Sequence, residues 1–244
     1  MISLIQITDI HLTENNKTKV RGCSTNKSFA KIVAFIAANE SPDFVISSGD
    51  ISNDGTKKSY ITYQKEIELL KKPVFTILGN HDNHDNFQAV FSTKLQTVEK
   101  ITLSETWLMI ALDSTAINKE SGHITRQQLL SLRKIIESNK NKNLVICLHH
   151  QPIKMGFWID EVGLENADQF IASIANQSNI KAVLWGHVHH ESESKLKSIK
   201  MLSTPSTCYQ FLESAEKPDT NKPGYRKINL FKSGKLETKV VRID

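Results

Sequence analysis

The chain contains six short apolar segments, separated by helix-like or polar stretches, and this repetition is the strongest constraint on its fold. The segments are residues 2–8, 43–48, 74–78, 107–112, 144–148 and 181–185. Near-continuous apolar runs of this length are typical of strands buried on both faces, as in a mainly parallel sheet that helices cover. The pattern therefore predicts an α/β fold.

Apolar residues at helical spacing predict two helices between these strands. The first covers the apolar positions within 29–36 and ends at Ser41-Pro42, because the residue before a proline disfavours helical geometry. The second begins at Thr125, whose side chain can cap the backbone while Gln128 returns the hydrogen bond. The first helix joins two apolar segments and so completes a strand–helix–strand unit.

The C-terminal part of the chain has a different pattern. Residues 199–204, 225–231 and 236–243 alternate polar and apolar or are rich in β-branched side chains, and Pro-Gly and Ser-Gly turns join them. Such segments are typical of antiparallel strands. Residues 214–224, rich in Pro, Lys and Asp, are predicted to form one exposed loop.

Length and charge limit the classes of protein to which the chain can belong. With 244 residues and no break in composition, residues 1–244 are predicted to form a single domain. The net charge is +5, but the lysines are scattered, which favours a solvated basic surface over a nucleic-acid groove. Nothing in the sequence indicates an oligomeric state.

The predicted compartment is the cytoplasm. The first residues have no basic leader and no cleavage site, and Asp9 interrupts the first apolar run. No stretch approaches the roughly 20 apolar residues that a membrane-spanning helix needs. Cys23, Cys147 and Cys208 are odd in number and form no CxxC pair, which indicates reduced thiols.

Polar motifs directly follow five of the six predicted strands. They are Asp9-Ile-His11, Gly49-Asp50, Gly79-Asn80-His81-Asp82, His149-His150 and Gly186-His187-Val-His189. In open α/β sheets, ligands bind beyond the carboxyl ends of the strands, so the five motifs are expected to converge on one site. Each motif alone could be an ordinary polar turn, but their occurrence at successive strand ends favours a shared function.

The residue types in these motifs predict a metal site. Imidazole nitrogens combine with carboxylate and amide oxygens and with no thiolate, a donor set that suits Fe, Mn, Zn or Co. Residues two apart on an extended backbone point to the same side, so each D-x-H or H-x-H pair can reach one centre. Asp50, in a central motif, could bridge two ions.

The remaining histidines and one tryptophan have weaker signals. Because His149 and His150 are consecutive, only one can point at the site, and His149 is taken as the ligand. His84, His123 and His190 are expected on the surface or in supporting positions. Trp158 either overhangs the site, anchors a partner or packs internally, and the sequence leaves these alternatives open.

The order and spacing of the five motifs, from residue 9 to residue 189, resemble the signature of the calcineurin-like metallophosphoesterases. A second set of segments resembles the bacterial class III cyclic-AMP phosphodiesterases over nearly the whole chain: QITDIHL, HHQP, WIDEVGLENADQF, STPSTCYQF and PGYRKINL. Gln151 and the segment RGCSTNKS depart from the patterns of that family. These departures concern the fine contacts to substrate.

The resemblance implies a four-layer α/β/β/α sandwich with a dinuclear metal site at the strand ends. The two divalent ions would be Fe or Mn, with Zn or Co as alternatives, and would share a bridging hydroxide. One ion would be held by Asp9, His11, Asp50 and His189. The other would be held by Asp50, Asn80, His149 and His187. Contacts to the nucleotide would come from His11, Asn80, His81 and His189.

The implied reaction is hydrolysis of 3′,5′-cyclic AMP to 5′-AMP. His81 would give a proton to the departing 3′ oxygen, and Asp82 would orient His81. Two alternatives remain at this point. One is the same chemistry on a 2′,3′-cyclic nucleotide, a glycerophosphodiester or a nucleic-acid end. The other is a weakly catalytic metal-binding module, whose mark would be a lost ligand, and none of the seven ligand positions is lost here.

Overall fold

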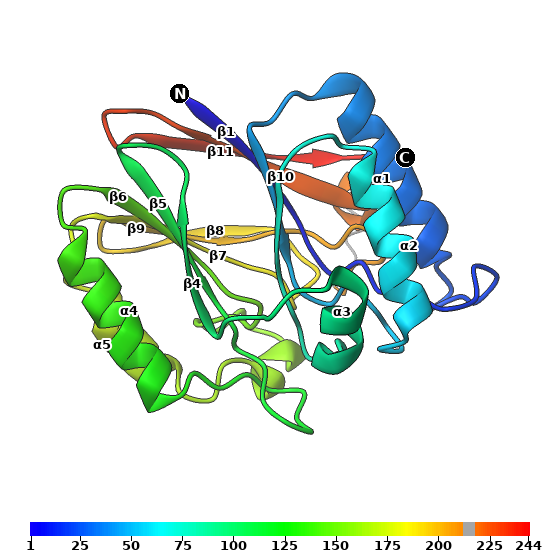
Figure 1. Ribbon diagram of the computed structural model, residues 1–244, viewed down its shortest axis with the longest axis horizontal. Coiled ribbons are helices and arrows are strands. Elements are labelled where there is room, and N and C mark those ends of the chain that lie inside the picture. Colours follow the sequence, from blue (N-terminus) through cyan, green and yellow to red (C-terminus); the bar gives the residue numbers. More distant parts are fainter. Residues whose placement is uncertain (212–217) are drawn as a thin grey trace.

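Two β-sheets pack face to face in the computed structural model, which describes residues 1–211 and 218–244 (Figure 1). The five-stranded sheet has the order β11 (Leu236–Arg242), β10 (Gly224–Leu230), β1 (Ile2–Ile7), β2 (Phe44–Ser48) and β3 (Val74–Ile77). The six-stranded sheet has the order β4 (Val98–Thr102), β5 (Trp107–Leu112), β6 (Asn143–Cys147), β7 (Ile180–Trp185), β9 (Ile199–Ser203) and β8 (Ser192–Leu196).

Helices cover the outer face of each sheet. On the five-stranded sheet these are α1 (Thr25–Asn39), α2 (Lys57–Glu68) and α3 (His84–Phe91), and they share one apolar cluster with β1 and β2. On the six-stranded sheet they are α4 (Arg126–Ser138) and α5 (Ala167–Ile174), which pack on β5, β6 and β7. The two groups of helices lie on opposite sides of the molecule (Figure 1). The four-layer α/β/β/α architecture implied by the resemblance is therefore confirmed.

The central strands are buried on both faces, as their continuous apolar runs predict. In β5, alternate residues belong to different layers because side chains in a strand point to opposite sides. Leu108, Ile110 and Leu112 pack towards α4 and α5. Trp107, Met109 and Ala111 belong to the cluster that fills the space between the two sheets, together with Leu4, Ile46 and Ile228 from the other sheet.

Most local predictions agree with the structure. All six predicted strands are present, and α4 begins with the predicted capping box, in which Thr125 Oγ1 accepts from Gln128 N and Gln128 Oε1 accepts from Thr125 N. β10 and β11 are antiparallel, as predicted. β9 was predicted to be antiparallel to its neighbours, but only its pairing with β8 is antiparallel. Its pairing with β7, on the other side, is parallel.

The predicted loop at 214–224 lies partly outside the described residues. Its described part contains a short 3-10 helix, η2 (Pro218–Asn221), and Gly224 begins β10 instead of ending a loop. Within residues 1–211 and 218–244, no helix combines the length and the apolar character needed to cross a bilayer.

Candidate metal centre

The five polar motifs meet at the carboxyl ends of strands from both sheets. Motifs after β1, β2 and β3 belong to the five-stranded sheet, and motifs after β6 and β7 belong to the six-stranded sheet. Hydrogen bonds join the two groups: His149 Nδ1 lies 2.8 Å from Ser48 O, and the Asp9 carboxylate accepts from His187 N at 2.9 and 3.1 Å. The site thus forms where the two sheets meet.

Six of the seven predicted metal ligands are buried at this junction. Their exposed fractions are at most 5%, and Asn80 is half-buried. Potential ligand atoms within 4.8 Å of one another form the groups Asp9–His11–His189, Asp9–Asp50–His149 and His11–Asp50–His81. The structure therefore brings five of the predicted ligands together in these groups, and Asp9, His11 and Asp50 each belong to two of them.

His149 and His189 are oriented by backbone carbonyls. The Nδ1 atom of His149 hydrogen-bonds to Ser48 O, which turns Nε2 towards Asn80 Oδ1 at 3.2 Å and Asp50 Oδ1 at 3.4 Å. The Nδ1 atom of His189 hydrogen-bonds to Tyr209 O at 2.9 Å, and its Nε2 lies 3.4 Å from Asp9 Oδ1. This arrangement, in which one ring nitrogen donates to a carbonyl and the other is free to ligate, is usual for metal-binding histidines.

Two buried ring nitrogens in the cluster have no hydrogen-bond partner. They are His187 Nε2 and His11 Nδ1. In addition, the Nε2 atoms of His11 and His189 face each other at 3.0 Å. A buried polar atom without a partner is costly, and a divalent ion would satisfy His187 Nε2 and the two facing Nε2 atoms, although not His11 Nδ1. The donor set of imidazole, carboxylate and amide therefore fits a metal centre.

The backbone of the cluster is strained in a consistent way. Five of the predicted ligands have left-handed conformations with φ between 46° and 65°: Asp9, His11, Asp50, His187 and His189. Residues other than glycine seldom adopt this region, and such strain concentrates at functional sites. The sharp turns let each side chain leave its strand end and point into the junction.

Two glycines allow the close packing of the cluster. A Cβ atom on Gly79 would lie 2.2 Å from Asp50 Oδ1 and 2.5 Å from Asp50 N. A Cβ atom on Gly49, where φ is +103°, would lie 2.3 Å from His149 Nδ1. Only glycine fits these positions without moving a predicted ligand.

Electrostatics leave most of the imidazoles in the neutral form that binds metals. Burial lowers the pKa of His187 and of His189 well below the usual value. For His149, burial lowers the pKa, but the charge and hydrogen bond of Asp50, with smaller contributions from Asp9 and Ser48, together raise the pKa to about 9. Burial would raise the pKa of Asp50, yet His149 holds it well below its usual range. Burial raises the pKa of Asp9 to about 7.

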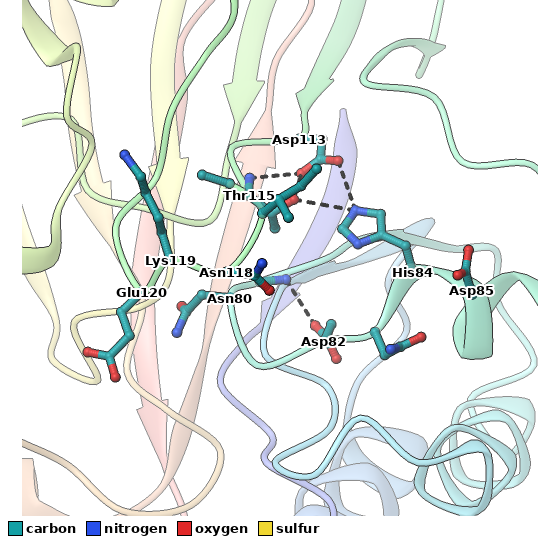
Figure 2. Close-up of a pocket in the computed structure, with 13 residues that line it drawn as sticks. Asn80, Asp82, His84, Asp85, Asp113, Thr115, Asn118, Lys119 and Glu120 are labelled. Atoms are coloured by element: carbon teal, nitrogen blue, oxygen red, sulfur yellow. Dashed lines mark hydrogen bonds and ion pairs between the residues drawn. The ribbon is translucent and has the colours of Figure 1, made fainter.

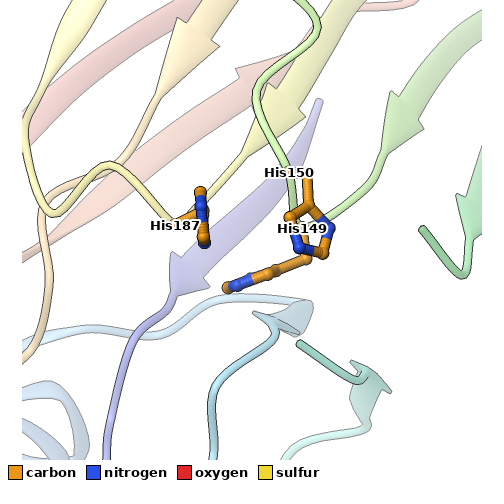
Figure 3. Close-up of side chains that lie close together, drawn as sticks. All are labelled: His149, His150 and His187. Carbon is orange, nitrogen blue, oxygen red and sulfur yellow. The ribbon is translucent and has the colours of Figure 1, made fainter. Parts of the chain in front are cut away.

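His150 lies beside the cluster with both ring nitrogens engaged. Figure 3 shows its imidazole close to those of His149 and His187, with which it forms a group of potential ligands. Its Nδ1 is 2.8 Å from Ser114 Oγ and its Nε2 is 3.1 Å from Glu120 O. Both consecutive histidines therefore lie close to His187, and the choice of His149 as the ligand and His150 as its neighbour stays a prediction.

His81 is exposed and lies at the edge of the cluster. Its ring packs edge-on against His11 with centroids 4.8 Å apart, and its backbone N donates to Asp50 Oδ1. The ring can therefore contact both the centre and a molecule in the adjoining cavity.

The Asp82 carboxylate contacts two loops and the Tyr60 hydroxyl. Its carboxylate accepts hydrogen bonds from the backbone N atoms of Ile51, Ser52 and Gly79 and from the Tyr60 hydroxyl. Burial, reinforced by Asp50, raises its pKa to about 6. These contacts do not support the expectation that Asp82 orients the His81 ring, because its oxygens are turned to the backbone of the two loops. Asp82 instead holds the loop after β2 against the loop after β3.

Two cavities adjoin the cluster. One, of about 230 Å³, is lined by predicted ligands at its inner end and by Trp158 and Phe211 at its outer end. The other, of about 770 Å³, shares Asn80 and Glu120 with it and is shown in Figure 2. Of the three alternatives for Trp158, a position over the site fits its place in the first cavity.

The remaining histidines have partners away from the cluster or lie only half-buried. His84 pairs with Asp113 at 3.0 Å in the wall of the larger cavity (Figure 2), and His123 pairs with Glu165 at 3.5 Å. His190 is half-buried. All three positions agree with the expected surface or supporting roles.

Several residues at the site escaped sequence reasoning. The carbonyls of Ser48 and Tyr209 orient ligands, but every residue has a carbonyl, so no residue type signals this role. Tyr60, which binds Asp82, lies on a helix that the sequence did not predict. Arg21 and Phe211 line the smaller cavity, and the sequence analysis used their segments, RGCSTNKS and STPSTCYQF, for the resemblance without singling out either residue.

Comparison with known proteins identifies the class. The chain matches the calcineurin-like phosphoesterase family over residues 2–191 and belongs to that family. It is 34% identical to a 3′,5′-cyclic adenosine monophosphate phosphodiesterase of Vibrio vulnificus, over 99% of this chain and 90% of that protein. It is 31% identical to the protein of the same name in Pseudomonas aeruginosa, over 100% of this chain and 90% of that protein.

Solved structures with the same fold are more distant in sequence. A dimetal phosphatase from Danio rerio superposes with a TM-score of 0.71 at 10% identity, covering 99% of this chain and 98% of the other. A purple acid phosphatase from yellow lupin has a TM-score of 0.67 at 14% identity, covering 93% of this chain and 49% of the other. At these identities the likeness concerns the fold.

Proposed function

We propose that this chain is a two-metal phosphodiesterase that hydrolyses 3′,5′-cyclic AMP to 5′-AMP. The observation that carries the proposal is the position of Asp50 between two sets of donors. Its Oδ2 lies 3.6 Å from His11 Nε2, and its Oδ1 lies 3.4 Å from His149 Nε2. Relatives named as cyclic-AMP phosphodiesterases, similar over the whole chain, support the choice of substrate.

The proposed ligand sets follow from this division. Asp9, His11, Asp50 and His189 would hold one divalent ion, and Asp50, Asn80, His149 and His187 the other. The ions would be Fe or Mn, with Zn or Co as alternatives, because the donors are nitrogen and hard oxygen. When bound, such a pair supplies Lewis acidity at the phosphoryl oxygens and lowers the pKa of a water molecule.

The side chains of the protein would orient the phosphodiester and protonate its leaving group. His11, Asn80, His81 and His189 line the smaller cavity and would contact the cyclic phosphate. His81, exposed at the edge of the cluster, would give a proton or a hydrogen bond to the departing 3′ oxygen. Asp82 and Tyr60 would act as positioning residues, since they hold the loop that carries His81.

The proposal covers residues 1–244 as one functional unit. The apolar cluster between the sheets contains residues from both, which supports treating them as one domain. The cytoplasmic location expected from the sequence stays a prediction.

A substrate panel on metal-reconstituted protein tests the proposal. We expect 3′,5′-cyclic AMP to be converted to 5′-AMP, with 3′-AMP absent or minor by chromatography, and chelation to stop the reaction. A much higher kcat/KM for a 2′,3′-cyclic nucleotide or a glycerophosphodiester would overturn the substrate assignment. Two bound ions without turnover of any phosphodiester would instead indicate a metal-binding module.

A further inference from the structure

The smaller cavity has an outer end that the proposed chemistry does not use. Its inner end contains predicted metal ligands, whereas its outer end is formed by Trp158, Phe211 and Arg21, which we call the aromatic rim. We propose that the aromatic rim binds the purine base of the nucleotide, with the indole of Trp158 as the stacking surface. This inference rests on the proposed function. It assigns a binding site to the base, the part of the substrate that the metal cluster does not contact.

A continuous series of ring contacts leads from the cluster to the rim. The Phe211 ring stacks on His189, with centroids 4.0 Å apart and an interplanar angle of 15°. The Trp158 ring meets Phe211 at 4.9 Å and 61°. Because His189 is proposed to contact both metal and phosphate, Trp158 lies two ring contacts away from the reacting end of the cavity.

The indole of Trp158 is exposed although its neighbours anchor it. Trp158 is 49% exposed, whereas Trp107 and Trp185 are fully buried. It begins the short 3-10 helix η1 (Trp158–Val162), where Ile159 is buried in the core. The Asp160 carboxylate accepts from the backbone N of Met155 and of Gly156, which closes the preceding turn. An exposed flat ring on a tied turn is a surface already organised for stacking.

Arg21 adds a positive charge to the same rim. Its guanidinium carbon lies 5.3 Å from the centroid of Phe211 and 5.9 Å from that of Tyr209. The side chain is exposed, so the charge is available to a bound molecule. Cyclic nucleotides combine one negative charge with a planar base. A guanidinium attracts the charge and can also stack on the base.

The rim should therefore affect substrate binding more than the chemical step. Stacking of a base on an aromatic side chain corresponds to about a 5- to 150-fold change in affinity. We expect Trp158→Ala to raise the KM for 3′,5′-cyclic AMP within that range while kcat changes little. Trp158→Phe should restore most of the affinity. A base-free cyclic phosphodiester, trimethylene phosphate, should be processed equally well by all variants.

The matched control is Leu69→Ala, which truncates a residue with 57% exposure outside the cavity and should leave KM unchanged. A second readout does not depend on turnover. In metal-loaded protein, 5′-AMP should quench tryptophan fluorescence with saturation and ribose 5-phosphate should not, because Trp158 is the exposed indole. The quenching should disappear in Trp158→Phe.

The outcomes separate the two proposals. If cyclic AMP is hydrolysed but Trp158→Ala leaves its KM unchanged and 5′-AMP quenching is absent, the rim assignment is wrong and the proposed function stands. An equal rise in KM for the base-free substrate would also contradict base stacking. If cyclic AMP is not hydrolysed but 5′-AMP quenches Trp158 selectively, the rim assignment stands and the proposed reaction is wrong.

Discussion

The buried cluster and the exposed aromatic rim are built differently, although they line one cavity. The cluster is formed by strand-end residues with left-handed backbones and carbonyl-bound imidazoles, so its geometry is set by the main chain. The rim is formed by exposed or half-buried side chains on the short 3-10 helix η1 and on irregular segments. Changes in the cluster should therefore abolish the reaction, whereas changes in the rim should alter which phosphodiester is preferred.

The largest effect is expected from Asp50→Asn. The amide keeps the shape of the side chain but removes the charge that two sets of donors share. Losing a residue that merely orients a ligand costs about 10–100-fold in metal affinity, and a shared ligand should cost more. Elemental analysis should find both ions depleted, and cyclic-AMP hydrolysis should be lost. Asp85→Asn, an exposed acid nearby, is the control; two retained equivalents of metal in Asp50→Asn would refute bridging.

His81→Ala tests whether His81, which lies at the edge of the cluster, acts on the leaving group without holding metal. The protein should keep its metal, while turnover of cyclic AMP falls by about 10²–10⁴-fold, the usual range for a lost general acid. The loss should be smaller for bis(p-nitrophenyl) phosphate, because p-nitrophenolate leaves without a proton. Equal losses on both substrates would indicate that His81 positions the phosphate instead.

Gly79→Ala tests how closely the cluster is packed. The added methyl group would meet both the carboxylate and the backbone of Asp50, so we expect metal affinity to fall by about 10–100-fold. Isothermal titration with Mn²⁺ measures this. The control is Gly156→Ala, where no atom lies within 4 Å of the new Cβ and only backbone strain at φ +85° is added. Similar affinities in the two variants would argue against a rigid cluster.

The smallest effect concerns His84, in the wall of the larger cavity. Its hydrogen bond with Asp113 raises its pKa above the usual value, so the pair stabilises the fold fully below about pH 6.5 and loses this contribution as pH rises through the raised pKa. In chelated protein, His84→Gln should lower the free energy of unfolding by less than about 1 kcal/mol at pH 6 and by less still at pH 9. A difference that grew with pH would contradict this sign.

The sequence predicted the cluster well because residue type and strand position coincide there. The glycine before Asp50 signals the close packing locally, but Asp9 and His11 follow β1 in left-handed conformations and not on the extended backbone that their spacing predicts. Helix α2 was missed although Tyr60, Tyr63 and Ile67 recur at helical spacing and pack in one apolar cluster. The prediction of two packed sheets depended on the resemblance alone, because no local sequence pattern shows which distant strands pair. The same is true of the contact between Phe211 and Trp158.

The junction between the sheets has a consequence for the lifetime of the protein. Ions held there would cross-link positions as distant in sequence as Asp9 and His189, and a ligand bound only to the folded state raises its stability by mass action. Metal scarcity would then lower the resistance of the chain to heat and proteases as well as its activity. The abundance of the protein would follow the supply of its metal.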